Sequence, residues 1–234
     1  THDIATLGLW GPKAVEALGN FIEPNEIDIK NFPFVSAKNL TLNLSGGKKV
    51  DVWAARISYV GESGWEIYFN NNKDDGLALY DSLLEVGVVP VGIETYANSR
   101  RLEKSFRLQG ADLETEYTAI EAAIQRPLVK EADFHGKAAH LAHREEDPCA
   151  ILCTMTLDNL NVSGKTRYPV GISPIIDPAT GEVPIDSKGR RSYTTGMSYC
   201  PSLKKFVVMG YLPKEIAIQG KSLLIEYFNE DGDG

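Results

Sequence analysis

The chain has 234 residues, with 24 Lys plus Arg against 32 Asp plus Glu, which gives a formal net charge of −8 at pH 7. With 43% apolar and 24% charged residues, its composition is that of a folded globular protein and excludes wholesale disorder. The acidic balance argues against nucleic acid as a partner, because binding the phosphate backbone needs an excess of basic residues.

The apolar runs and the number of cysteines give further information about the class of protein. No apolar run approaches the roughly 20 residues that a membrane span needs, and the first residues show no basic-then-apolar signal pattern. We therefore expect no membrane partner. Three cysteines, an odd number, fit a reducing compartment better than a disulfide scaffold.

The first part of the chain alternates between strand and helix patterns. Gly11-Pro12 opens a helix, because the missing N–H of proline costs nothing at the first helical position. Ser45-Gly46-Gly47-Lys48 supplies the glycines of a hairpin turn between two β segments. The expected elements in this part are a strand at 6–11, a helix from 12 to about 22, strands at 39–44, 50–59 and 65–69, and helices at 77–87, 94–106 and 133–143.

The chain changes character after the charged run that ends at Pro148. It becomes rich in short strands and turns, with expected strands at 150–158, 191–199, 206–212 and 222–228. Evenly spaced short strands are typical of a small antiparallel β-barrel or sandwich. We therefore predict an α+β protein with a boundary near residue 147: a mixed helix and antiparallel-sheet domain over 1–147, then a small antiparallel β-barrel over 148–234.

The stretch 56–67 is the most informative for function. Gly61 and Gly64 flank Glu62 at a strand-to-strand turn, a geometry that can present the carboxylate to a cavity with Tyr59 and Trp65 as apolar walls. A carboxylate so placed suits a ligand edge with two adjacent N–H donors, such as a 2-amino-4-oxo-pyrimidine, because both oxygens accept at once. The alternative is a surface hairpin with a solvated Glu62, which composition alone favours.

This stretch resembles the (R)-x-x-Y-x-G-E-x-G-(W/Y)-E-(I/L) signature of the glycine-cleavage T-protein (aminomethyltransferase) superfamily. Four further segments resemble motifs of the same family in the same order: L-x-L-(Q/W)-G-P-x-A at 7–14, S-L-R-L-E-(K/A)-G at 99–107, E-A-G-L with D-F-I-G-(R/K) at 120–137, and G-x-x-S-P-x-L with G-Y-(L/V)-P at 196–213. Trp10 and the Phe32-Pro33-Phe34 lead-in look most like the folate-binding modules fused behind flavin-dependent dimethylglycine or sarcosine dehydrogenases.

The resemblance implies a tetrahydrofolate-binding protein of one-carbon metabolism, and we expect it in the cytoplasm, or in the mitochondrial matrix if the protein is eukaryotic. The implied donor is a small methylated amine or an aminomethyl group on a lipoyl carrier protein, with a flavin domain upstream in the intact protein. By position, Glu62 matches the family carboxylate on the pterin edge, with Tyr59, Gly61 and Trp65 around it. Arg101 matches the Arg of R-L-E, which implies either a contact with the glutamate tail of folate or an ion pair that fixes the helix.

The sequence departs from the family pattern at some positions. Ala97, Arg100 and Ala123 stand where the family has Arg, Leu and Gly. The family's catalytic Asp lies ahead of L-x-L-(Q/W)-G-P, so no catalytic residue is nominated and we expect a fragment of a longer protein. A folate-binding module without catalysis and a sulfoniopropionate-type demethylase remain alternatives. An Fe–S-assembly or tRNA-linked relative is weaker, because its K-G-C-Y-x-G-Q-E pattern is missing.

The histidines and cysteines predict no metal site. His135, His140 and His143 lie close in sequence, but no Cys, Asp or Glu at ligand spacing completes a set. Cys149 and Cys153 fall on one face of an expected strand, where we interpret them as small buried apolar residues rather than a thiol pair.

Overall fold

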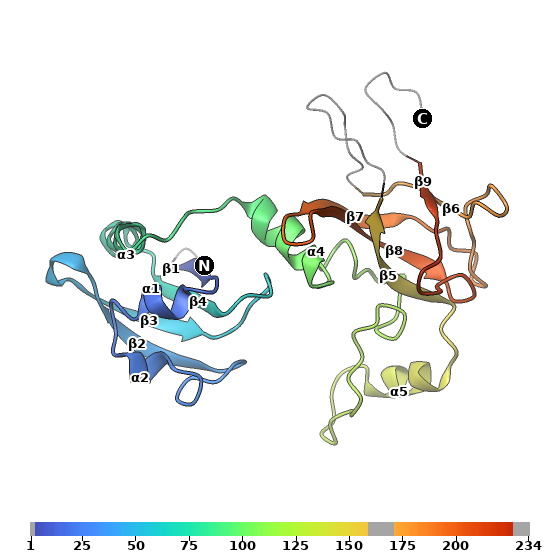
Figure 1. Ribbon diagram of the computed structural model, residues 1–234. Coiled ribbons are helices and arrows are strands. Elements are labelled where there is room, and N and C mark those ends of the chain that lie inside the picture. The colour runs from blue at the N-terminus through green and yellow to red at the C-terminus, as the bar shows by residue number, and fades with distance from the viewer. Residues whose placement is uncertain (1–2, 159–170, 227–234) are drawn as a thin grey trace. The chain divides into compact units, whose positions relative to one another are not determined.

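The computed structural model describes residues 3–158 and 171–226 (Figure 1). The chain folds into two compact units: unit 1 runs from Thr1 to Tyr96 and unit 2 from Ala97 to Gly234. Helices and antiparallel sheets occur in both, which confirms the α+β class. The domain boundary near residue 147 stays a prediction. No helix in the described ranges has the length and apolar character to cross a membrane.

Unit 1 is built on a four-stranded antiparallel sheet in the order β1-β4-β3-β2. Its strands are β1 (Ile4–Trp10), β2 (Ala37–Asn43), β3 (Lys49–Ala55) and β4 (Gly64–Asn70). β2 and β3 form the expected hairpin through a 3-10 turn at Ser45–Gly47. The strand expected over 50–59 stops at Ala55, because the N–H of Ile57 donates to the Ala55 carbonyl and turns the chain out of the sheet.

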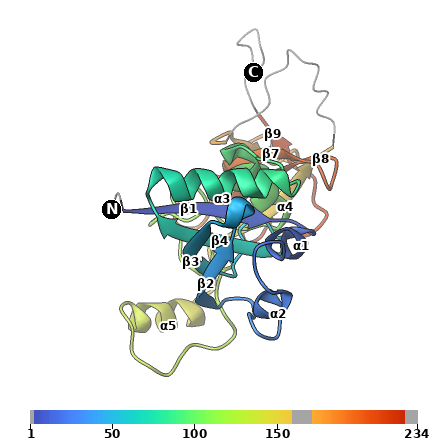
Figure 2. The same ribbon diagram turned by 90° about the vertical axis from the view of Figure 1, so that its left-hand side faces the viewer.

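Three helices accompany this sheet: α1 (Ala14–Leu18), α2 (Pro24–Ile27) and α3 (Lys73–Glu85). The longest, α3, lies along the sheet in Figure 2. It begins at Asn72, whose side chain accepts the Asp75 N–H at 2.7 Å and caps the first turn. The helix expected from Pro12 to about residue 22 is shorter, because the chain leaves α1 at Gly19.

The core of unit 1 lies on one face of the sheet. Because strand side chains alternate between faces, every second residue of each strand points into this core. Residues on the opposite face are exposed, as are Thr6, Asp51 and Trp53, or half-buried, as are Glu66 and Tyr68. The core comprises Leu9, Leu40, Leu42, Val50, Val52, Ala54, Trp65, Ile67 and Phe69 of the strands, with Ala14, Leu18, Ile27, Leu79 and Leu83 of the helices among others.

Unit 2 begins inside a helical segment. One turn of π-helix at Thr95–Arg100 continues into the short α4 (Arg101–Glu103). The helix expected over 94–106 therefore ends early, because Ser105 adopts a left-handed φ of 55° that a helix cannot continue through. A longer helix, α5 (Lys137–Glu145), lies near the expected position of 133–143.

The described strands of unit 2 form two small antiparallel sheets. β5 (Ala150–Leu157), β8 (Lys205–Pro213) and β7 (Thr194–Cys200) make one sheet in that order, and β6 (Ile175–Ile176) pairs with β9 (Leu224–Ile225). Within the parts of unit 2 that the structure describes, no ladder closes these strands into a ring. The barrel is therefore not confirmed, and part of the strand expected at 222–228 lies outside the described residues.

Candidate functional site

The turn between β3 and β4, residues 56–63, carries the segment that the sequence singles out. Arg56 anchors its start: the side chain is buried and donates from Nη1 to the carbonyl oxygens of Ile27 (3.1 Å) and Phe32 (2.7 Å). The guanidinium also lies 5.0 Å from the centre of the Trp65 ring. The first residue of the turn is thus fixed to the core of unit 1.

Two glycines shape the end of the turn. Gly61 has a φ of 73°, in the left-handed region that favours glycine. Gly64 has a φ of 154°, and a Cβ at this position would stand 1.9 Å from the carbonyl oxygen of Leu9. No other residue fits at Gly64 without moving β1, so the backbone on both sides of Glu62 depends on glycine.

The turn is also tied to the end of β1. Trp10 donates from Nε1 to the Ile57 carbonyl at 2.9 Å, and the Gly11 N–H donates to the Ser63 carbonyl at 2.9 Å. These two bonds lie on either side of Glu62 in the sequence. They hold the Glu62 segment next to the Trp10 end of β1.

An aromatic group, formed by Trp10, Tyr59 and Tyr96, lies beside this turn. The Trp10 and Tyr96 rings stack with centroids 5.2 Å apart and planes 28° apart. Tyr59 meets Tyr96 at 5.3 Å and 49°. Gly8 makes room for this arrangement, since a Cβ there would stand 2.0 Å from the Trp10 ring. The aromatic group therefore offers flat apolar surface near the turn.

A second carboxylate, that of Glu66, lies close to the aromatic group. The Tyr68 hydroxyl donates a hydrogen bond to Glu66, and this bond raises the pKa of Tyr68 to about 12. Burial, followed by the charge of Glu66, raises the pKa of Tyr96 as well. Both phenols therefore stay protonated at neutral pH, and Glu66 supplies negative charge at this edge of the aromatic group.

The residues of the expected folate site differ in how deeply they are buried. Tyr59, Gly61 and Glu62 are half-buried in the turn. Trp65 is 0% exposed and packs in the core of unit 1 against Phe32, so it cannot wall an open cavity. The reason is strand parity, because Trp65 is on the same face of β4 as the core residues Ile67 and Phe69.

The sequence interpretation did not place Trp10, Tyr96 or Glu66 in the site. Trp10 is visible in the sequence as a motif variant, and Glu66 is the second Glu of the 56–67 signature. Tyr96 carries no local signal, because it reaches Tyr59 and Trp10 only through the fold.

The residues that could hold a metal ion are dispersed. Among residues 3–158 and 171–226, no group of three His, Cys, Asp or Glu side chains has a geometry suited to a metal. Cys149 and Cys153 are free thiols of intermediate exposure, so they are less buried than expected, while Cys200 is fully buried.

The family model of the GCVT N-terminal domain matches residues 1–131, more than half of the chain. The chain belongs to the GCVT family. Human mitochondrial dimethylglycine dehydrogenase is 28% identical over 246 residues, which cover 99% of this chain and 25% of that protein. An aminomethyltransferase of Symbiobacterium thermophilum is 30% identical over 236 residues, which cover 94% of this chain and 57% of that protein.

A solved structure of a GCVT relative shares the fold. Glycine cleavage system aminomethyltransferase T from Bartonella henselae superimposes with a TM-score of 0.69 at 22% identity, over 96% of this chain and 55% of that one. The chain thus spans about a quarter of the dehydrogenase and little more than half of the two aminomethyltransferases.

The Arg of the R-L-E motif makes buried contacts within unit 2 that stabilise the fold. Arg101 is 1% exposed, pairs through Nη1 with the carboxylate of Asp112, and donates from Nε to the Ala97 carbonyl at 2.8 Å. Glu103 pairs instead with Arg100 at 2.7 Å. Of the two roles that the resemblance implies for Arg101, these contacts match the ion pair; its partner, however, is a loop residue outside the helix.

The position of Arg101 explains why the G-x-x-S motif begins with glycine. A Cβ on Gly196 would lie 2.7 Å from Nη2 of Arg101. Burying a guanidinium this deeply leaves no space for a side chain on the strand beneath it. The two motifs are distant in the sequence and in contact in the fold.

The Glu of the E-A-G-L motif is also held in a buried ion pair. Glu121 accepts a hydrogen bond from Arg190. The Arg190 guanidinium lies 4.3 Å from the centre of the Tyr117 ring. The Tyr117 ring stacks on Tyr211, with centroids 3.5 Å apart. Burial alone would raise the pKa of Glu121, but the bonds from Arg190 and from the Thr118 N–H lower it to about 2. The motif therefore fastens the irregular segment before α5 to the sheet of unit 2.

Proposed function

We propose that this chain binds tetrahydrofolate in unit 1 and is part of a protein that transfers a one-carbon unit to N5 of the folate. Membership of the GCVT family supports the proposal. The names of the relatives, an aminomethyltransferase and a dimethylglycine dehydrogenase, describe chemistry on aminomethyl and N-methyl groups.

The observation that carries the proposal is the aromatic group beside the Gly61–Glu62 turn. A pterin is a flat ring with adjacent N–H donors on one edge, so it needs an apolar face to stack on and a carboxylate to accept from that edge. Tyr59, Trp10 and Tyr96 supply the face, with ring centroids 5.2 to 5.3 Å apart. Glu62 supplies the carboxylate, in a turn bonded on both sides to β1.

These residues would orient the folate and keep water away from its reacting nitrogen. We propose a small methylated amine as the one-carbon donor, because the match to dimethylglycine dehydrogenase covers 99% of this chain. A flavin domain upstream would supply the oxidation of such a donor. An aminomethyl group on a lipoyl carrier is the alternative donor. A folate-binding module without catalysis would need only the orienting role.

The test is a titration of the 234-residue chain with 5-formyltetrahydrofolate by isothermal calorimetry. We expect saturable binding at one site. Glu62→Gln removes the charge-assisted pair while keeping the size of the side chain, and it should weaken binding by about 1.5–3 kcal/mol, which is roughly 10- to 150-fold. Glu85→Gln, an exposed carboxylate at the end of α3, should leave the affinity unchanged.

A further pair of variants tests the stacking surface. Tyr96→Ala should weaken folate binding, whereas Tyr80→Ala on α3 should not, because Tyr80 is outside the aromatic group. Equal binding by Glu62→Gln and the parent chain would refute the site. Absence of saturable binding, with unit 1 shown to be folded by its fluorescence, would refute the proposed ligand.

A further inference from the structure

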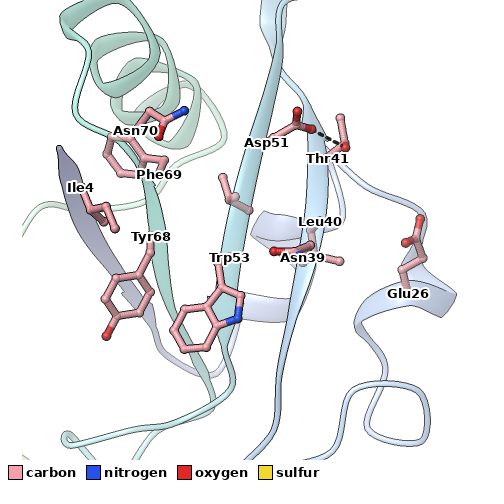
Figure 3. Close-up of a pocket in the computed structure, with 11 residues that line it drawn as sticks. Ile4, Glu26, Asn39, Leu40, Thr41, Asp51, Trp53, Tyr68, Phe69 and Asn70 are labelled. Carbon is pink, nitrogen blue, oxygen red and sulfur yellow. Dashed lines mark hydrogen bonds between the residues drawn. The ribbon is translucent and has the colours of Figure 1, made fainter.

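The outer face of the unit 1 sheet carries a groove of about 700 Å³ away from the 56–63 turn (Figure 3). The strand register places Tyr68 directly opposite Trp53, with Thr6 and Asn39 at the two ends of the same row. Figure 3 shows the Trp53 and Tyr68 side chains adjacent, on the same face of β3 and β4. The two rings form the centre of this face.

The two rings are held in a fixed, partly open arrangement. Their centroids are 5.1 Å apart and their planes are tilted by 58°, and Trp53 is 46% exposed. The hydrogen bond from Tyr68 to Glu66 fixes the phenol and raises its pKa to about 12, so the Tyr68 ring stays neutral at pH 7. Tilted aromatic rings with exposed faces attract organic cations through their quadrupoles.

The charged residues that line the groove are acidic. The groove is lined by the acidic residues Glu26 and Asp51, and neither Lys nor Arg is present among its described lining residues. Asp51 is positioned by the Thr41 hydroxyl, which donates to it at 2.6 Å. On the neighbouring strand, the Lys38 ammonium bonds to the backbone carbonyl of Glu26 and does not line the groove.

We propose that this groove binds a methylated ammonium group, with the Trp53 and Tyr68 rings against the methyl groups and the carboxylates of Asp51 and Glu26 balancing the charge. A sugar would also stack on exposed aromatic rings and donate hydroxyls to the carboxylates, but only a cation gains their charge–charge attraction as well. The ring pair and the negative lining together select a cation. This site goes beyond the proposed folate function and uses other residues of unit 1.

The test uses choline as the probe and its neutral isostere 3,3-dimethyl-1-butanol, which has the same shape without the charge. Binding is measured by ¹H–¹⁵N NMR, from the backbone amide shifts of β3 and β4 in the full chain. The indole N–H of Trp53 should shift, while those of the other two tryptophans should not. We expect saturation by choline in the millimolar range and at least about fivefold weaker binding of the alcohol.

Two variants separate the contributions of ring and charge. Trp53→Leu keeps an apolar side chain but removes the π face, and we expect choline to bind about fivefold more weakly or worse. Asp51→Asn keeps an acceptor for Thr41 and should weaken choline by about two- to fivefold, whereas the matched change Asp81→Asn on α3 should not. Both side chains at 51 and 53 are exposed, so the sheet should fold in either variant.

Three outcomes would overturn the proposal. They are equal binding of choline and its neutral isostere, unchanged choline binding by Trp53→Leu, and no saturable shift on β3 or β4. Saturation of the same residues by methyl glucoside with the affinity of choline would assign the groove to a sugar instead. Loss of folate binding in Glu62→Gln would leave the choline result untouched, so the two proposals fail separately.

Discussion

Units 1 and 2 bury different kinds of side chain. Unit 1 has one large apolar core, and Arg56 is its single buried charged residue within the described part of the chain. The described part of unit 2 has two smaller apolar clusters and buries several charged residues: Arg101, Asp112, Glu121, Asp177 and Asp186.

The difference has a physical consequence. Apolar burial is non-directional and does not depend on protonation, so unit 1 tolerates small adjustments of its core. A buried ion pair repays its desolvation only with correct geometry and with both charges present. We therefore expect unit 2 to respond strongly to single charge changes and to acid, and unit 1 to respond weakly. All three tryptophans are in unit 1, so their fluorescence reports on that unit separately.

The largest expected effect is the loss of the Arg101 charge. Arg101→Met leaves the carboxylate of Asp112 buried without its ion pair, which should lower the free energy of unfolding of unit 2 by about 3–5 kcal/mol. The measurement is urea unfolding followed by far-UV circular dichroism, with tryptophan fluorescence recorded in parallel.

Lys214→Met is the matched control, because Lys214 pairs with Asp147 on the exposed surface of the same unit. It should cost at most about 1 kcal/mol. If the two variants lost the same stability, or if the fluorescence midpoint of unit 1 moved as far as the dichroism midpoint, the contrast between the units would be wrong.

The next effect is acid sensitivity through Glu121. Its pKa is about 2 in the folded chain against an ordinary 4.5, so its stabilising contribution is fully present above pH 5 and disappears as the pH falls towards 2. A depression of this size corresponds to about 3 kcal/mol. Arg190 and Lys188 are the basic side chains that pair with this carboxylate.

Urea unfolding at pH 7, 5 and 3 measures this dependence. Glu121→Gln should lower the stability of unit 2 at pH 7 and flatten its pH profile, whereas Glu131→Gln, an exposed carboxylate in the same unit, should change neither. A profile that stays equally steep in Glu121→Gln would assign the acid sensitivity to another carboxylate.

The smallest effect is a gain in stability. Ala123 has a φ of 53°, where an L-residue is strained by about 1–2 kcal/mol. Ala123→Gly should remove that strain at the cost of more freedom in the unfolded chain, for a net stabilisation of about 0.5–1 kcal/mol. Thermal unfolding measures the change.

The neighbouring residue supplies the control. Ala122 is 2% exposed and has no left-handed φ, so Ala122→Gly should destabilise unit 2 by about 1 kcal/mol. The two substitutions are chemically identical and should have opposite signs. A lower melting temperature for both would refute the strain at Ala123.

The sequence predicted local elements well where a periodic pattern met a clear end signal. The hairpin of β2 and β3 follows from Gly46 and Gly47, and α3 begins after the Asn70–Asn72 run that breaks the strand pattern. Prediction failed where the backbone departs from its local preference. The helix expected over 94–106 cannot continue through Ser105, whose φ of 55° is left-handed.

The candidate site was predicted only in part. The glycines around Glu62 carry a local signal, because their φ values and the close approach of Leu9 require glycine. Which tryptophan faces outward does not follow from alternation, since Trp53 and Trp65 both sit in alternating strands. The register and the position of the helices bury Trp65 and expose Trp53.

The sequence by itself determined the α+β class, the order of the main elements and the family motifs, because these depend on spacing along the chain. The tertiary structure decided which motif residues meet. It joined Arg101 to Asp112 and Gly196, Glu121 to Arg190, and Tyr96 to Tyr59 and Trp10. Such contacts depend on how distant segments pack, and a buried charge or ring takes the partner that the fold brings within reach.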